Sequence, residues 1–201
     1  MAGADEEELG ALLRERSLER AATRAIEIYG AELYGFLVHL LGDESAADEV
    51  WAQTVEDLWR GLPTFSARCS VRTWLYVLAR HAAARYRRTP FHRAARRAGD
   101  SKLDGLVDRA RSRTQPWQRT EIKDRLRDLR ASLDDEARCL LALRLDRGMS
   151  WQEIARVTLG VEAPEPRALA RESDRLRKRF QLLKEDLRAR ARASGLLDED
   201  P

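Results

Sequence analysis

Segments with the periodicity and capping residues of amphipathic helices follow one another along most of the chain, and no stretch alternates apolar and polar residues convincingly as a strand would. An interruption is expected near Gly30, between helical segments at residues 18–29 and 31–41. Residues that can cap the first turn of a helix precede three later segments: Asp43, Ser70 and Ser150. We therefore predict an all-α protein.

The helical segments fall into two groups, which predicts two small domains. Apolar residues make up 43% of the 201 residues, enough for compact cores, while the 35% of charged residues favours two small cores over one large one. We expect the domains at residues 17–90 and 119–192, joined by a flexible linker at residues 91–118 that has little periodicity. An acidic extension (residues 1–16) and a frayed tail (residues 193–201) complete the chain.

Several classes of protein are excluded by what the chain lacks. No apolar run is long enough to span a bilayer and no signal-peptide pattern is present, so we expect a cytoplasmic protein without membrane insertion. The only cysteines, Cys69 and Cys139, are far apart, and the three histidines form no metal-ligand or triad pattern. No Gly-rich phosphate loop occurs. We therefore expect no catalysis, no cofactor and no metal.

Charge is segregated along the first domain, which the net charge of +3 conceals. Residues 43–59 carry six acidic side chains and no basic one, whereas residues 61–99 carry nine arginines and no acidic residue. An acid-free arginine segment is a candidate surface for a polyanion, because each phosphate contact releases counterions. The alternative is a solvated helix face followed by a basic linker, but a solvated face normally mixes both signs.

The helix expected over residues 71–88 has two opposed faces. An apolar face spans about 100° on a helical wheel: Val71, Trp74, Leu75, Leu78 and Ala82. A basic face with one aromatic lies nearly opposite: Arg72, Tyr76, Arg80 and Arg87. Phe65 and Arg68 stand in the loop just before this helix. Arginine contacts phosphates and an aromatic ring stacks on an unpaired base, so the pattern indicates single-strand binding, although a lone aromatic such as Tyr76 is more often part of a core.

Five strings carry a family resemblance: Leu33-Tyr34-Gly35-Phe36, Leu40-Leu41-Gly42-Asp43, Ala47-Asp48-Glu49-Val50-Trp51, Leu58-Trp59-Arg60 and the FxxxxSxRTWLYxLAR pattern from Phe65 to Arg80. They resemble region 2 of the bacterial RNA polymerase sigma factors, most closely the small two-domain extracytoplasmic-function (ECF) class. The resemblance covers about residues 18–88. It implies that the helix around Trp59 binds the β′ clamp of core polymerase, and that the later loop and helix melt and read the -10 promoter element.

The resemblance assigns roles to individual residues. Polymerase contacts are expected from five: Asp48, Glu49, Gln53, Glu56 and Trp59. Contacts with the -10 element are expected from seven: Phe65, Arg68, Arg72, Tyr76, Arg80, His81 and Arg87.

The second domain is expected to contain a helix-turn-helix, with an ordinary helical hairpin as the alternative. Ser150-Trp151-Gln152-Glu153 has the spacing of a capping box. The string from Arg147 to Ala155 resembles region 4 of the same family, although the connection at residues 159–166 is longer than usual and contains two prolines. The helix that follows carries apolar residues on one side and basic residues on the other, as a major-groove reader does. The resemblance implies contact with the polymerase β flap, and with the -35 element through Arg167, Arg171, Arg175 and Lys178.

These features predict a non-catalytic ECF-type sigma factor that binds core polymerase, recognises promoter DNA and directs the initiation of transcription. The resemblance also implies control by an anti-sigma factor. Two alternatives stay open: a helix-turn-helix regulator that binds duplex DNA without polymerase, and a sigma-like adaptor that no longer initiates.

Overall fold

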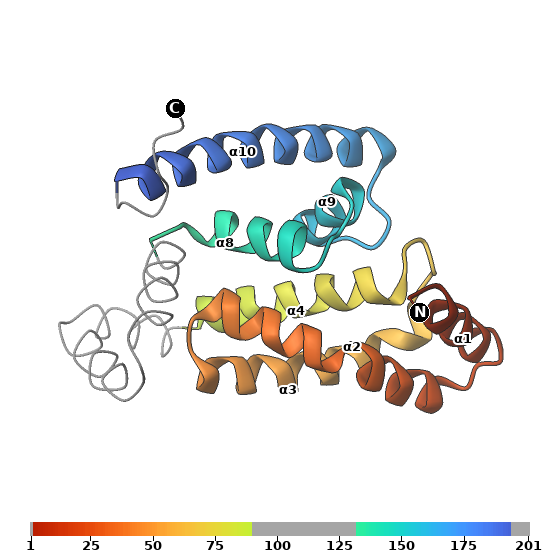
Figure 1. Ribbon diagram of the computed structural model, residues 1–201. Helices are drawn as coiled ribbons and strands as arrows, with labels where there is room; N and C mark the ends of the chain where they lie inside the picture. Colours follow the sequence, from red (N-terminus) through yellow and green to blue (C-terminus); the bar gives the residue numbers. More distant parts are fainter. Residues whose placement is uncertain (1, 90–131, 194–201) are drawn as a thin grey trace.

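The computed structural model of the chain describes residues 2–89 and 132–193, and every regular element in these two ranges is helical (Figure 1). The predicted all-α class is confirmed for this part of the chain. None of the described helices is long and apolar enough to cross a membrane. The expected linker, the start of the second domain up to residue 131 and the tail after residue 193 lie outside the described residues.

The first half is a bundle: α1 (Ala2–Arg14), α2 (Leu18–Leu41), α3 (Glu44–Gly61), the 3₁₀ turn η1 (Leu62–Thr64) and α4 (Val71–Arg88). Helix α2 is continuous, so the interruption expected near Gly30 is wrong. Gly30 is buried, and a Cβ placed on it would lie 3.5 Å from the indole ring of Trp51 on α3. This glycine therefore lies inside α2, packed at ordinary contact distance against α3, and does not end a helix.

The predicted caps fix where α3 and α4 begin. The Asp43 carboxylate accepts the backbone N–H of Ala46 at 2.7 Å. The Ser70 hydroxyl accepts the backbone N–H of Thr73 at 3.1 Å. Each cap satisfies a donor that the first turn of the helix would otherwise leave unpaired.

The acidic extension expected at residues 1–16 contains a helix, α1, that docks on the start of α4. The Glu6 carboxylate accepts the backbone N–H groups of Val71 and Arg72, each at 3.0 Å. A negative charge at this position also interacts favourably with the α4 dipole. Leu9, on the same helix, is fully buried, so α1 is part of the first bundle.

The second half consists of α8 (Asp135–Leu141), the π-helical turn η3 (Ala142–Asp146), α9 (Trp151–Leu159) and α10 (Pro166–Ala193). The predicted capping box is present: Ser150 N–H donates to Glu153 at 2.7 Å, and Glu153 N–H donates to the Ser150 hydroxyl at 3.3 Å. Gly160, with a φ of 69°, ends α9 before the turn into α10.

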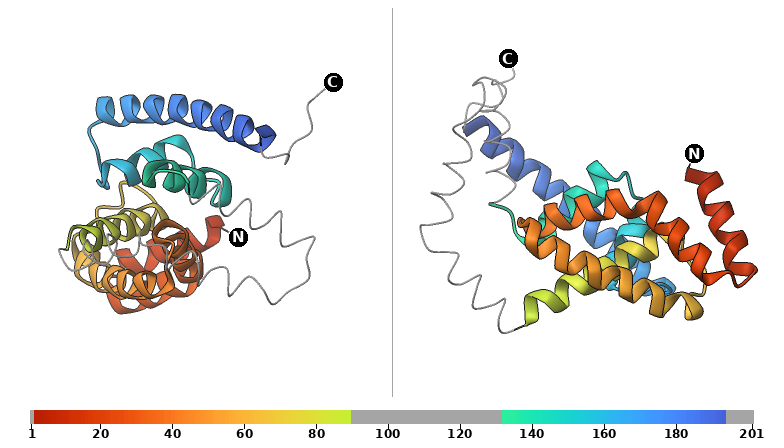
Figure 2. Two further views of the ribbon diagram at one scale, coloured as in Figure 1. Left: turned by 90° about the vertical axis from the view of Figure 1, so that its left-hand side faces the viewer. Right: turned by 90° about the horizontal axis from the view of Figure 1, so that it is seen from below.

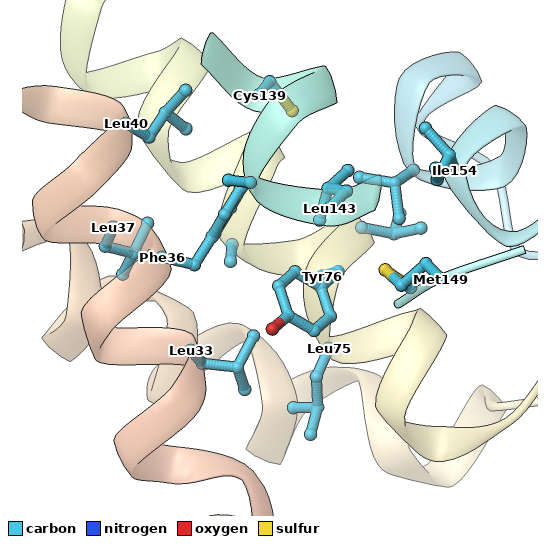
Figure 3. Close-up of a cluster of buried hydrophobic side chains, with 14 of the residues drawn as sticks. Leu33, Phe36, Leu37, Leu40, Leu75, Tyr76, Cys139, Leu143, Met149 and Ile154 are labelled. Carbon is cyan, nitrogen blue, oxygen red and sulfur yellow. The ribbon is translucent and has the colours of Figure 1, made fainter. Parts of the chain in front are cut away.

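The two halves share one hydrophobic cluster (Figure 3). The rings of Phe36 on α2 and Tyr76 on α4 meet edge to face, with centroids 5.1 Å apart. The second half contributes many residues to the same cluster, among them Leu143, Met149 and Ile154. Figures 1 and 2 show α8 and α9 as a layer between α4 and α10. Independent folding of the two domains stays a prediction, but in this structure they are in direct contact.

Candidate polymerase and nucleic-acid interfaces

The outer face of α3 brings together the five residues expected to bind polymerase. Trp59 is 43% exposed, so a large part of its indole ring is available to a partner. The Tyr34 hydroxyl donates to Asp48 at 2.7 Å, and the Gln53 amide donates to Glu56 at 3.0 Å. The opposite side of α3 is buried in the bundle through Ala46, Ala47, Val50, Thr54 and Leu58. An exposed indole among acidic groups suits a protein partner better than DNA.

Arg72, on α4, connects the two halves of the protein. Its Nε donates to Glu32 on α2 at 2.7 Å, and its Nη2 donates to the backbone oxygen of Arg147 at 3.0 Å. Burial, the largest single effect, acts to lower the pKa of Arg72, but the hydrogen bond to Glu32 and its charge raise that pKa overall. The guanidinium is therefore charged and held between α2 and the second half.

Tyr76 is fully buried, so its expected place on an exposed basic face is wrong. Its hydroxyl donates to Glu32 at 3.2 Å. Burial, followed by the nearby Glu32 charge, raises the pKa of the phenol. The helical wheel correctly groups Tyr76 with Arg72, but a wheel cannot show that the second half covers that side of α4. In this arrangement the ring cannot stack on a base.

Arg80 and Arg87 also face the second half. Arg80 Nη1 donates to the Cys139 sulfur on α8 at 3.5 Å, a long contact to a weak acceptor. Arg87 forms an ion pair with Asp135 at 2.8 Å and donates to the backbone oxygen of Leu40 at 2.7 Å. The arginines of the expected single-strand face are thus paired within the protein.

His81 lies beside the end of α9. A Cβ placed on Gly160 would be only 2.3 Å from His81 Nε2, so the imidazole ring lies directly against this glycine. Desolvation, followed by the charges of Arg85 and Arg80, lowers the pKa of His81 below 6.5, while Asp57 acts in the opposite direction.

The loop before α4 is fixed at both ends. The Phe65 ring stacks on Trp74 with centroids 4.6 Å apart, which holds it against the bundle. The Arg68 side chain is exposed, while its backbone N–H donates to Glu162 of the α9–α10 turn at 3.2 Å. The loop therefore also contacts the second half.

The outer side of α10 carries the four residues expected to read duplex DNA, and all are exposed: Arg167, Arg171, Arg175 and Lys178. The opposite side buries Leu176, Phe180 and Leu183, so the predicted two-sided helix is confirmed. Arg175 is not free, because it bonds to both Glu172 and Glu136, and these bonds raise its pKa.

Two carboxylates at this interface, Glu32 and Glu162, were not predicted. Glu32 bonds to Arg72, which lies 40 residues further along the chain, and no short-range pattern marks such a pair. Glu162 lies in the connection that is longer than usual in the resembled family, and that length is the one sequence signal that could have drawn attention to it.

The described residues thus combine a helical bundle with an acidic, exposed α3 face and a pair of helices, α9 and α10, of which the second carries exposed basic residues. Residues 25–90 match the family described as Sigma-70 region 2. The ECF RNA polymerase sigma factor SigX of Bacillus subtilis is 27% identical over 164 residues, which cover 80% of this chain and 84% of the relative. The probable RNA polymerase sigma-C factor of Mycobacterium bovis is 29% identical over 138 residues, covering 69% and 71%. Residues 25–90 are thus similar to sigma-70 region 2, and the similarity to named ECF sigma factors extends over most of the chain.

Proposed function

We propose that this protein is an ECF-type sigma factor that binds core RNA polymerase, directs it to promoters and enables it to initiate transcription, without catalysing a reaction itself. The observation that carries the proposal is the match of residues 25–90 to sigma-70 region 2 on a bundle whose acidic α3 face exposes Trp59. A regulator that needs only duplex DNA would have no use for that face.

The α3 face is the proposed contact for the β′ clamp. Trp59 would supply the apolar anchor, since exposed aromatics dominate the binding energy of many interfaces. The surrounding Asp48, Glu49 and Glu56 would set orientation and speed association with a basic partner. Gln53, held by its bond to Glu56, completes the surface.

The loop at residues 65–70 and helix α4 are the proposed reader of the -10 element. Arginines along α4 would contact the backbone of the non-template strand, while the loop around Phe65 would receive unstacked bases. Binding of these bases supplies the free energy of melting, so no nucleotide hydrolysis by this chain is needed. Arg72, Arg80 and Arg87 must first leave their partners in the second half.

The exposed side of α10 is the proposed reader of the -35 element. Arg167, Arg171 and Lys178 present charge on a helix whose other side is packed, which is the geometry of a recognition helix in the major groove. We also propose that the second half contacts the β flap, that an anti-sigma factor controls the protein and that it acts in the cytoplasm.

Run-off transcription tests this function. Purified chain is added to core polymerase on genomic promoter fragments, and start sites are mapped. Discrete transcripts that need both components support the proposal. A chain that binds duplex DNA but does not co-purify with core is a separate regulator, and one that co-purifies but yields no transcript is a non-initiating adaptor.

A further inference from the structure

The loop before α4 forms a cradle of donors around one carboxylate oxygen. Oε1 of Glu162 accepts the backbone N–H of Ser66 at 2.9 Å, the Ser66 hydroxyl at 2.6 Å and the backbone N–H of Arg68 at 3.2 Å. Ala67, between the two amides, has a φ of 54°, a left-handed conformation that is uncommon for a residue other than glycine. Successive amides turned toward one point in this way form an anion-binding nest. The loop can therefore bind an oxyanion.

The anion that fills the cradle comes from the other half of the protein. Glu162 lies in the turn between α9 and α10, more than ninety residues beyond the loop, at the point where the connection is longer than usual in the family. Gly160 opens this turn in a left-handed conformation, and Pro164 and Pro166 restrict its far end. The turn thus holds a carboxylate against the loop while α9 packs on α4.

The second half of the protein also covers the rest of the α4 face. Figure 1 shows α9 lying alongside α4, and polar contacts between the halves run from one end of that helix to the other. They are Arg72 to the backbone oxygen of Arg147, Thr73 to Glu153, Arg80 to Cys139, and Arg87 to Asp135. A nucleic-acid strand cannot lie along α4 while α8 and α9 are in place.

We propose that Glu162 is an internal competitor of DNA: its carboxylate holds the phosphate-binding cradle of the Ser66–Arg68 loop in the closed protein, and a phosphate of single-stranded DNA takes that cradle when the halves separate. The inference rests on the proposed function and adds a regulatory contact to the -10 site. Because the closed state and the DNA-bound state exclude each other, each interaction that stabilises closure weakens strand binding by the same free energy.

Binding of a fluorescently labelled oligo-dT strand to the full chain, measured by anisotropy at low salt, tests the competition. Glu162→Gln should bind about three- to tenfold tighter than the wild type, as expected for the loss of a partly exposed, charge-assisted contact. Glu165→Gln is the matched control, because it removes the same charge from an exposed position in the same turn. It should change binding by much less. Adding Ser66→Ala to Glu162→Gln removes a cradle donor and should reverse part of the gain.

The two thiols report whether the halves separate. Cys139 is buried under Arg80 at the interface, and Cys69 is half-buried next to the cradle, where burial and then the charge of Glu162 raise its pKa to about 12. Saturating oligo-dT should speed the reaction of both thiols with a disulfide reagent. Without DNA, Glu162→Gln should speed the reaction of Cys139, whose pKa does not depend on Glu162; Cys69 is not used for this variant, because loss of the Glu162 charge alone would speed its reaction. Circular dichroism of each variant checks that the fold is kept.

Equal strand binding by Glu162→Gln and Glu165→Gln, no strand binding by any variant, or thiol rates that do not respond to the strand would overturn the competition. If the wild type still directs run-off transcription in any of these cases, the sigma function stands and only the role of Glu162 fails. If no variant directs transcription with core polymerase, the proposed function itself is at fault.

Discussion

Gly61 and Gly10 should respond in opposite ways to substitution by alanine, because their surroundings differ. A Cβ on Gly61 would lie 2.7 Å from the Trp74 ring, which is stacked on Phe65, whereas a Cβ on Gly10 would meet nothing within 4 Å. We expect Gly61→Ala to destabilise the protein by about 1–3 kcal/mol through overpacking. Gly10→Ala, within helix α1, should stabilise it by about 0.5–1 kcal/mol. Urea unfolding of both variants measures this, and equal shifts in the same direction would contradict the packing around Trp74.

His81 predicts a pH dependence with a definite sign. Its pKa in the folded protein is lowered below 6.5, first by desolvation and then by Arg85 and Arg80, so below that pH the unfolded chain takes up a proton more readily. The stabilisation is therefore complete above about pH 6.5 and is lost as the pH falls through the lowered folded value. Unfolding midpoints between pH 8 and pH 5.5 should fall more steeply for the wild type than for His81→Asn. Parallel curves would show that His81 does not titrate in this way.

At the scale of a helix, the features that can be predicted from the sequence are those set by interactions within one turn. The caps at Asp43 and Ser70 and the capping box at Ser150 act within one turn, so their residue types and spacing are sufficient. The interruption expected at Gly30 is wrong because packing against Trp51 of another helix keeps this glycine inside a continuous helix. The helical wheel places Tyr76 on the correct side of α4, but the sequence does not show that the second half covers that side and buries the ring.

The α3 face predicts a specific loss of polymerase binding. Reversing two exposed charges, Asp48→Lys with Glu49→Lys, should weaken the affinity for core polymerase, and Trp59→Ala should weaken it by about tenfold or more. The buried side of α3 is untouched, so the unfolding midpoint should stay close to that of the wild type. A pull-down titration measures the affinity, with Glu19→Lys at the exposed start of α2 as the control. Unchanged affinity would remove α3 from the interface.

Two arginines of α10 are expected to differ although both are exposed. Arg175 is bound to Glu172 and Glu136, whereas no carboxylate within residues 2–89 and 132–193 pairs with Arg171. Arg171→Ala should weaken duplex binding by about 1–3 kcal/mol if it contacts a base edge, and Arg175→Ala should weaken it less. If Arg171 contacts only phosphate, the loss should be equal on all sequences and the salt dependence shallower. Gel-shift titrations separate these results, and a larger loss for Arg175 would reverse the assignment.

At the scale of the whole molecule, the sequence could predict two groups of helices but not that they close on each other. The charge pattern singles out α4 as a candidate nucleic-acid surface, because an acid-free arginine segment is a property of sequence alone, and its contact with DNA stays a prediction. The carboxylates and backbone oxygens that occupy this surface come from distant segments, such as Glu162 and the backbone of Arg147. A surface predicted to be open is therefore closed by contacts that only the folded chain brings together.

Permanganate reactivity of unpaired thymines at a mapped start site measures promoter opening directly. With core polymerase and this chain together, thymines of the -10 element should become reactive, and neither component alone should produce the signal. Arg80→Ala should reduce the reactivity more than it reduces closed-complex binding, because α4 acts on the separated strand. Thymines that react equally without this chain, or that stay protected in its presence while the complex forms, would contradict the assignment of promoter opening to this protein.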